Sequence, residues 1–175
     1  TITNENSVNV CTILDANNDG VTWKYLQNDG SNLPAIEISN GEVTHDDWLI
    51  LPALSLKAGV LYNLTYRLAT MGQNYPELLE VKYGSEPTAA AMVHEIAAKK
   101  EYSNQEFSTI KNELVVDKDQ VAYIGFHCVS NPDLCYQLIL KDFAVVGNSL
   151  KAPDAVTEIS TTAATDGSLK VRVDF

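Results

Sequence analysis

The chain has 175 residues, of which 45% are hydrophobic and 20% are charged, a composition typical of a globular protein with one full domain and a remnant. No apolar run approaches the roughly 20 residues that span a bilayer, so we expect no membrane insertion. Twelve basic and 23 acidic residues give a formal net charge of −11. This charge disfavours binding to nucleic acid or to anionic lipid, and it is compatible with binding of hard cations such as calcium.

Short alternating segments between turn signals predict an all-β sandwich with enough strands for a jelly roll. The expected strands are residues 7–14, 21–26, 35–38, 47–51, 61–68, 77–83, 105–115, 120–129 and 136–146. One segment departs from this pattern, because Pro87 precedes a run of strong helix formers in which Met92, Val93 and Ile96 share one side. We therefore expect one short helix on the flank of the sandwich, over residues 87–98.

The composition changes near Pro153, and the rest of the chain predicts a hairpin from residues 155–159 and 169–175. A two-stranded unit is marginal alone, so the tail either packs on the first domain or opens a second, truncated one. The second interpretation is favoured because sandwich domains commonly begin this way. With a start at Thr1 and no initiator Met, this predicts a piece of a longer chain, with one domain over 1–150 and the opening of another over 151–175.

An acidic loop, residues 15–20, carries Asp15, Asn17 and Asp19 in alternation before Gly20, like the opening of an EF-hand loop. The Glu that the full motif needs is replaced by Leu26, and no helix pattern flanks the loop, so it is not an EF-hand. Three side-chain oxygens on a tight turn can still supply half of a calcium shell. The alternative is a polar turn whose side chains hydrogen-bond their own backbone.

The three cysteines cannot all pair within one chain, and they lack the Cys-x-x-Cys spacing of zinc sites. Cys128 and Cys135 enclose a turn-like hexapeptide and would bridge a hairpin in an oxidising compartment. The sequence leaves open whether they do, because pairing is not fixed by spacing alone.

The sequence shows no catalytic constellation. No nucleophile motif or phosphate loop is present, so the histidines are expected to be packed or surface groups: His45, His94 and His127. Asp46 and Asp47 are adjacent on an expected strand and face opposite sides, which does not suit a paired acid and base of a glycosidase. We expect no enzymatic activity.

Several stretches follow one another in an order and spacing typical of a known family: DANNDGVTWKY (15–25), DDWLILP (46–52), AGVLYNL (58–64), YPELLEVKYG (75–84), PTAAAM (87–92), YIGFH (123–127) and LKDF (140–143). Together they resemble the cleaved-adhesin domains of gingipain-type haemagglutinins, which belong with the MAM-like "choice-of-anchor" jelly rolls. The resemblance covers residues 8–146 and implies a galactose-binding-like β-sandwich without catalysis. The tail resembles the fibronectin type III-like modules that often follow such domains.

The resemblance also implies a partner for the acidic loop. In related galactose-binding-like sandwiches an acidic residue near the final strand completes a calcium shell, which by analogy makes Asp142 the fourth metal ligand. Glu37 and Asp47 are further candidates. The calcium would be structural, because it would neutralise clustered carboxylates and pin the loop to the closing strand.

Two functions follow from this resemblance. The first is a calcium-stabilised adhesion or carbohydrate-binding module of a secreted or surface-attached bacterial protein, which binds a glycan or a host protein. Tyr75 and Tyr102 lie near loop-like segments and are the expected ligand-stacking aromatics. The second is a structural spacer that positions a neighbouring peptidase or glycosidase domain.

Overall fold

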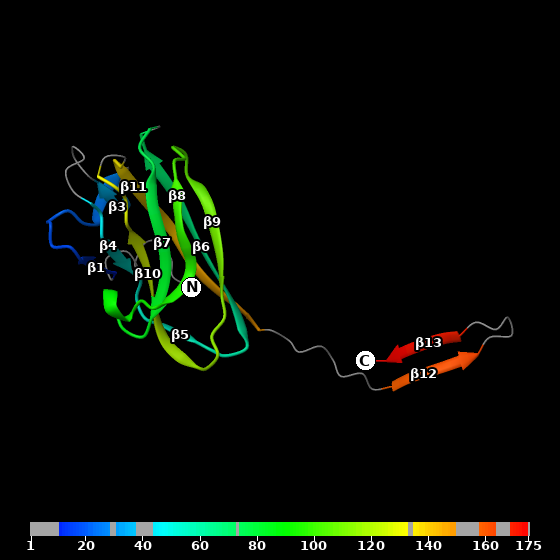
Figure 1. The fold of residues 1–175 in the computed structure, drawn as a ribbon. Helices are drawn as coiled ribbons and strands as arrows, with labels where there is room; N and C mark the ends of the chain where they lie inside the picture. The colour runs from blue at the N-terminus through cyan, green and yellow to red at the C-terminus, as the bar shows by residue number, and fades with distance from the viewer. Residues whose placement is uncertain are drawn as a thin grey trace.

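The computed structural model describes residues 11–28, 31–37, 44–72, 74–132, 135–149, 158–163 and 169–174. Within these ranges two antiparallel sheets pack face to face as a jelly-roll β-sandwich, which confirms the predicted fold class (Figure 1). The first sheet has, in spatial order, β1 (Thr12–Asp15), β4 (Asp47–Ile50), β10 (Gln120–Cys128), β7 (Glu77–Gly84) and β8 (His94–Tyr102), with β5 (Leu54–Leu56) also paired to β10. The second has β2 (Lys24–Asn28), β3 (Ser31–Glu37), β11 (Gln137–Ser149), β6 (Val60–Met71) and β9 (Ser108–Leu114).

The main core lies between the two sheets, where alternate residues of each strand point inward. Phe126 of β10 is at its centre and meets Tyr66 and Phe143 edge-on, at centroid distances of 4.9 and 5.2 Å. Leu49, Ile124 and Leu140 are among the fully buried aliphatic side chains around it. The inward alternation therefore makes the first sheet hydrophobic on the face toward the second sheet.

The first sheet is covered on its outer face as well, by a smaller cluster of Trp48, Ile50 and Met92. The chain after β7 folds back over this face through a 3-10 turn, η2 (Ala89–Ala91). Two glycines leave room for it: a Cβ at Gly84 would lie 2.0 Å from the Ala91 carbonyl oxygen, and one at Gly125 would lie 2.9 Å from the Trp48 ring. Because both faces of the sheet are buried here, every residue of β4 is buried, and its last three residues, 48–50, are consecutive apolar side chains.

The prediction of a helix over residues 87–98 is wrong. Only the 3-10 turn is helical, and the chain then enters β8, which pairs with β7 from Tyr83 opposite His94 to Glu77 opposite Tyr102. The partner strand supplies main-chain hydrogen bonds along most of β8, and this tertiary pairing outweighs the local helix propensity of the alanine run. Strand β5 is a second element that the sequence pattern missed.

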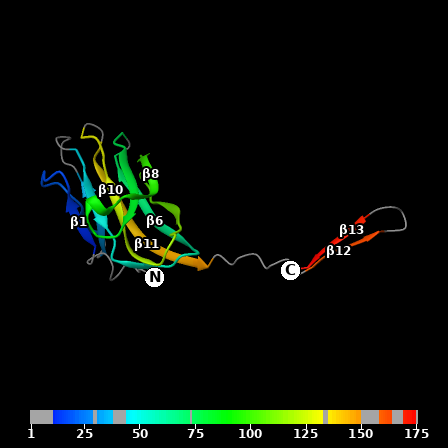
Figure 2. The ribbon, with the colours of Figure 1, turned by 60° about the horizontal axis from the view of Figure 1, so that its bottom comes forward.

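The tail forms a hairpin, as expected, from β12 (Glu158–Ala163) and β13 (Leu169–Asp174), in register from Glu158 opposite Asp174 to Ala163 opposite Leu169. This hairpin is a two-stranded sheet of its own (Figure 2). The domain division at residue 150 and the fibronectin-like identity of the tail stay predictions. No helix in the described ranges is long and apolar enough to cross a membrane.

Candidate functional site

The acidic loop that follows β1 is held by hydrogen bonds from its own backbone. The Asp15 carboxylate accepts the N–H groups of Asp19 at 3.2 Å and Gly20 at 2.9 Å. Asp19 Oδ1 accepts the Val21 N–H at 2.8 Å, and Asn17 Oδ1 accepts the Asp19 N–H at 3.3 Å. This is the side-chain-to-backbone pattern of a polar turn, and it places three oxygen-bearing side chains around one short stretch of chain.

The loop is also tied to the start of β4. Asn17 Nδ2 donates to the Thr44 carbonyl oxygen at 2.7 Å, and the Ala16 N–H donates to the Asp46 carbonyl oxygen at 3.0 Å. Asp15 itself is the register partner of Asp47 in the β1–β4 pair. Side chains directly opposite each other share one face of a sheet, so the Asp15 and Asp47 carboxylates lie on the same side.

Asp47 is fully buried, and its Oδ1 has no hydrogen-bond partner among the described residues. Oδ2 accepts the Asp46 N–H at 3.2 Å. Burial raises the pKa of Asp47 to about 6, the nearby Asp15 carboxylate adds to the rise, and the Thr22 hydroxyl opposes it. A buried carboxylate oxygen without a donor is costly, and a cation held between Asp47 and the acidic loop would satisfy it.

Asp142, the fourth ligand expected from the resemblance, lies in the second sheet, and its part in a calcium site stays a prediction. Asp142 lies in a bulge of β11 with φ of 56°, and its Oδ2 is 3.6 Å from Nη1 of Arg67 on β6.

Asp47, one of the two further candidates, is the register partner of Asp15 in the loop. The side chain of Glu37, the remaining candidate, falls outside the described part of the structure.

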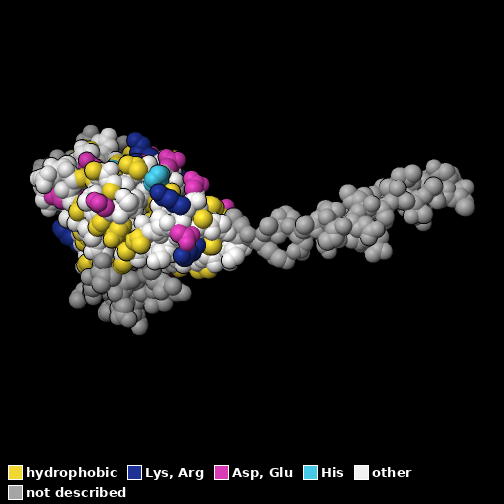
Figure 3. Space-filling model, turned by 90° about the horizontal axis from the view of Figure 1, so that it is seen from below, with side chains coloured by type: hydrophobic (Ala, Val, Ile, Leu, Met, Phe, Trp, Pro, Cys, Tyr) yellow, Lys and Arg dark blue, Asp and Glu magenta, His cyan; other side chains and the backbone are white. Residues whose placement is uncertain are grey.

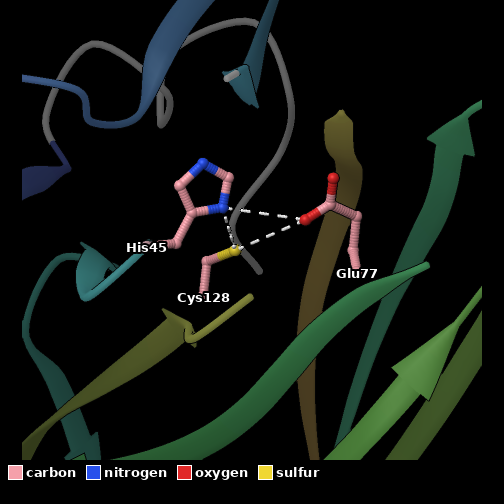
Figure 4. A group of neighbouring side chains, drawn as sticks. All are labelled: His45, Glu77 and Cys128. Carbon is pink, nitrogen blue, oxygen red and sulfur yellow. Dashed lines mark hydrogen bonds and ion pairs between the residues drawn. The ribbon is translucent and has the colours of Figure 1, made fainter. Parts of the chain in front are cut away.

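A second group of ligand-type side chains, which we call the buried cluster, consists of His45, Glu77 and Cys128, and all three are fully buried (Figure 4). His45 Nδ1 lies 3.2 Å from Cys128 Sγ and 3.7 Å from Glu77 Oε2, and Sγ lies 3.9 Å from Oε2. Burial raises the pKa of the Cys128 thiol well above its ordinary value, and the Glu77 carboxylate adds to the rise. Sequence analysis missed this cluster because its members lie 32 and 51 residues apart along the chain.

The sequence left open whether Cys128 and Cys135 form a disulfide, and in the structure they are not bridged. Cys128 is the last residue of β10 and its sulfur points into the buried cluster, where it also lies 3.4 Å from Ser130 Oγ. The inward direction of Cys128 follows from the strand alternation that buries Phe126 and Ile124 on the same face.

The outer face of β10 presents a third arrangement, centred on His127. Its Nδ1 is 2.7 Å from Glu80 Oε1 and its Nε2 is 2.6 Å from Asp46 Oδ1, while its ring stacks on Trp48. Asp46 is half-exposed and turned outward, whereas Asp47 is fully buried. The two neighbouring aspartates therefore face opposite sides of the strand, as predicted, and do not form a paired acid and base.

Of the two tyrosines expected to stack on a ligand, Tyr102 belongs to the main core and is only 9% exposed. Tyr75 is 46% exposed and has a neighbour that the sequence did not indicate, Tyr136, which is 45% exposed. Their ring centroids lie 6.1 Å apart with the planes tilted by 44°. In the sequence Tyr136 is the first residue of the strand expected over residues 136–146, and no local signal pairs it with Tyr75.

The surface seen in Figure 3 is chemically mixed, with hydrophobic side chains in small groups between acidic and basic ones. Such a surface has no uniform positive field for a phosphate backbone, in keeping with the acidic composition.

The fold is similar to that of solved adhesin domains. The K1 cleaved adhesin domain of Lys-gingipain from Porphyromonas gingivalis matches with a TM-score of 0.65 and 20% identity, over 84% of this chain and 96% of that domain. The K3 domain of the same protein matches with a TM-score of 0.65 and 17% identity, over 82% and 95%. This chain has the fold of a cleaved adhesin domain. The resemblance drawn from the sequence is thereby confirmed at the level of the fold.

Other neighbours of the cleaved-adhesin fold are carbohydrate-binding modules. The CBM22-1 xylan-binding domain from Paenibacillus barcinonensis matches with a TM-score of 0.50 and 10% identity, over 82% of this chain and 87% of that domain. No family model and no curated protein matches the sequence. At these identities the similarity establishes the architecture, and function has to be argued from the sites.

Proposed function

We propose that this chain is a non-catalytic binding module of a secreted or surface-attached protein, and that its ligand is a glycan or an extracellular protein. The observation that carries the proposal is the exposed pair Tyr75 and Tyr136. Exposed aromatic rings stack on sugar rings and apolar side chains, and they lose little conformational freedom when they do so. Similarity in fold to adhesin domains and to a xylan-binding domain supports the same conclusion.

The backbone N–H of each tyrosine is hydrogen-bonded. The Tyr75 N–H donates to the Gly72 carbonyl oxygen at 3.1 Å, and its ring covers Gly72 so closely that a Cβ there would lie 2.7 Å from Cδ2. The Tyr136 N–H donates to Glu77 Oε1 at 2.7 Å. Met71, which is 41% exposed, ends β6 beside Gly72 and adds an apolar side chain. A partly apolar platform whose backbone is fixed by hydrogen bonds loses less conformational freedom when a ligand binds.

The second part of the proposal is that calcium stabilises the acidic loop. Side-chain oxygens of Asp15, Asn17 and Asp19 surround the turn, and the unpartnered Oδ1 of buried Asp47 supplies a carboxylate from β4. An all-oxygen donor set with several carboxylates is the chemistry that calcium prefers. The donor types therefore suit the ion, with Asp47 in the role first given to Asp142.

A binding experiment tests the first part. The whole chain is screened against a glycan array and a panel of extracellular proteins, and any specific ligand is titrated against Tyr75→Ala and Tyr136→Ala. We expect each variant to weaken binding by about tenfold or more, as is usual for a central aromatic contact. Tyr83→Ala is the matched control, because Tyr83 stacks on His94 instead.

Saturable binding that survives both substitutions would place the ligand site elsewhere and refute the role of the tyrosine pair. Failure to bind across broad panels, with a folded protein, would favour the structural spacer, which positions a neighbouring domain and needs no ligand of its own.

A further inference from the structure

We propose that the buried cluster of His45, Glu77 and Cys128 is a binding site for a transition metal ion, and that Zn²⁺ is the ion that fits it. His45 directly precedes β4, Glu77 is the first residue of β7 and Cys128 is the last residue of β10. Figure 4 shows the three side chains pointing toward one another. A metal there would join the ends of three neighbouring strands at one end of the first sheet. The inference stands independently of the proposed ligand.

The distances within the cluster differ by only a few tenths of an ångström from those between the ligand atoms of one metal ion. Zinc bonds of about 2.3 Å to sulfur and 2.0–2.1 Å to nitrogen or oxygen, at tetrahedral angles, separate the donor atoms by about 3.3–3.6 Å. The observed separations are 3.2 Å from Nδ1 to Sγ, 3.7 Å from Nδ1 to Oε2 and 3.9 Å from Sγ to Oε2. Shifts of a few tenths of an ångström would bring all three atoms onto one ion.

Two of these separations are long for direct hydrogen bonds, whereas Nδ1 and Sγ at 3.2 Å are within hydrogen-bond distance. Glu77 Oε2 is too far from Nδ1 for a good hydrogen bond and is at the outer limit from Sγ, whereas its other oxygen, Oε1, is well satisfied by the Tyr136 N–H at 2.7 Å. His45 Nε2 is buried without a partner among the described residues, so the directed interactions of the ring run through Nδ1. Glu77 Oε2 thus has no short hydrogen bond within the cluster, and all three ligand atoms lie within 4.8 Å of one another around one point.

Charge and donor type select the ion. One thiolate, one carboxylate and one neutral imidazole balance a divalent cation, which removes the cost of burying an isolated charge. Sulfur and imidazole ligands suit zinc and do not suit calcium, so this site is chemically distinct from the acidic loop. Ser130 Oγ, 3.4 Å from Sγ, is within reach of a fourth position.

Cobalt substitution tests the site in the whole 175-residue chain, kept reduced and saturated with calcium. Titration with Co²⁺ should give a thiolate-to-cobalt charge-transfer band and tetrahedral visible bands that saturate at one equivalent, and Zn²⁺ should displace them. Zn²⁺ should also raise the melting temperature by about 5–10 °C, and a zinc-selective chelator should reverse this.

Variants assign the ligands. Cys128→Ser should abolish the thiolate band, while Cys11→Ser and Cys135→Ser should keep it. Glu77→Gln, which retains an oxygen for the Tyr136 N–H, should weaken Zn²⁺ binding by about tenfold or more. The proposal is overturned if the folded wild-type chain gives no thiolate band, if the band survives in Cys128→Ser, or if Glu77→Gln binds Zn²⁺ unchanged.

Discussion

The imidazole of His127 lies flat on the indole of Trp48, with ring centroids 3.9 Å apart and planes inclined by 9°. The two residues are register partners on β10 and β4, so the stack runs across the strands on the outer face of the first sheet. The stack fixes the ring so that its two nitrogens meet Glu80 and Asp46. A packed aromatic contact thus positions a polar network that joins three neighbouring strand regions.

Glu80 should make the stability of this network depend on pH. Burial acts to raise the pKa of Glu80, but hydrogen bonds and charge from Lys82 and His127 outweigh it, so the pKa is lowered overall. A lowered folded-state pKa contributes stability above the unfolded value, and this contribution is lost as the pH falls through the folded one. Glu80→Gln should therefore cost about 1–3 kcal/mol at pH 7 and progressively less below pH ~4.5.

Chemical denaturation of wild type and Glu80→Gln between pH 3 and pH 7 measures this difference. Glu86→Gln, at an exposed position, is the control and should change stability little at any pH. A loss in Glu80→Gln that is the same at both ends of the range would show that the charge is not responsible.

Calcium should stabilise the chain through the acidic loop. Saturating calcium is expected to raise the melting temperature of the wild type by about 5–10 °C relative to chelator. Asp19→Ala should remove most of this rise, because Asp19 contributes two oxygens to the loop. Calorimetry in both conditions measures the effect, and equal melting temperatures of the wild type with and without calcium would leave the loop as a polar turn.

The effect of Asp47→Asn on the free energy of unfolding should be opposite in chelator and in calcium. In chelator at pH 8 the variant should be more stable than wild type by up to about 3 kcal/mol, because it removes a buried carboxylate whose pKa is raised to about 6. In saturating calcium it should be less stable, because it removes a ligand. Denaturant titrations in the two conditions give the comparison, and a variant that is destabilised equally in both would exclude Asp47 as a ligand.

The cover over the outer face should depend on the absence of a side chain at residue 84. Gly84→Ala would place a Cβ 2.0 Å from the Ala91 carbonyl oxygen, and only movement of the η2 turn could relieve the clash. We expect a loss of about 1–3 kcal/mol, together with greater exposure of Trp48. Urea titration followed by tryptophan fluorescence measures both, with exposed Ser85→Ala as the neighbouring control. An unchanged midpoint of the urea titration would show that the η2 turn does not pack tightly against β7 at residue 84.

Much of the sandwich could be predicted from local sequence. Strands such as β6, β7 and β10 were expected within a few residues of their bounds, because alternation and turn residues are local signals of a half-buried sheet. The alanine run before β8 gave the wrong element because helix propensity is also local, while the pairing with β7 that decides the outcome is not.

The candidate sites divide in the same way. The acidic loop was visible because its oxygens lie within six consecutive residues, and turn chemistry depends on near neighbours. Asp47 as its partner, the Tyr75–Tyr136 pair and the buried cluster were decided by tertiary structure, since their members come from different strands and loops. The sequence by itself determined the composition of each strand and turn. Which strands became neighbours was decided by burial of both faces of the first sheet, and that choice brought His45, Glu77 and Cys128 to one point.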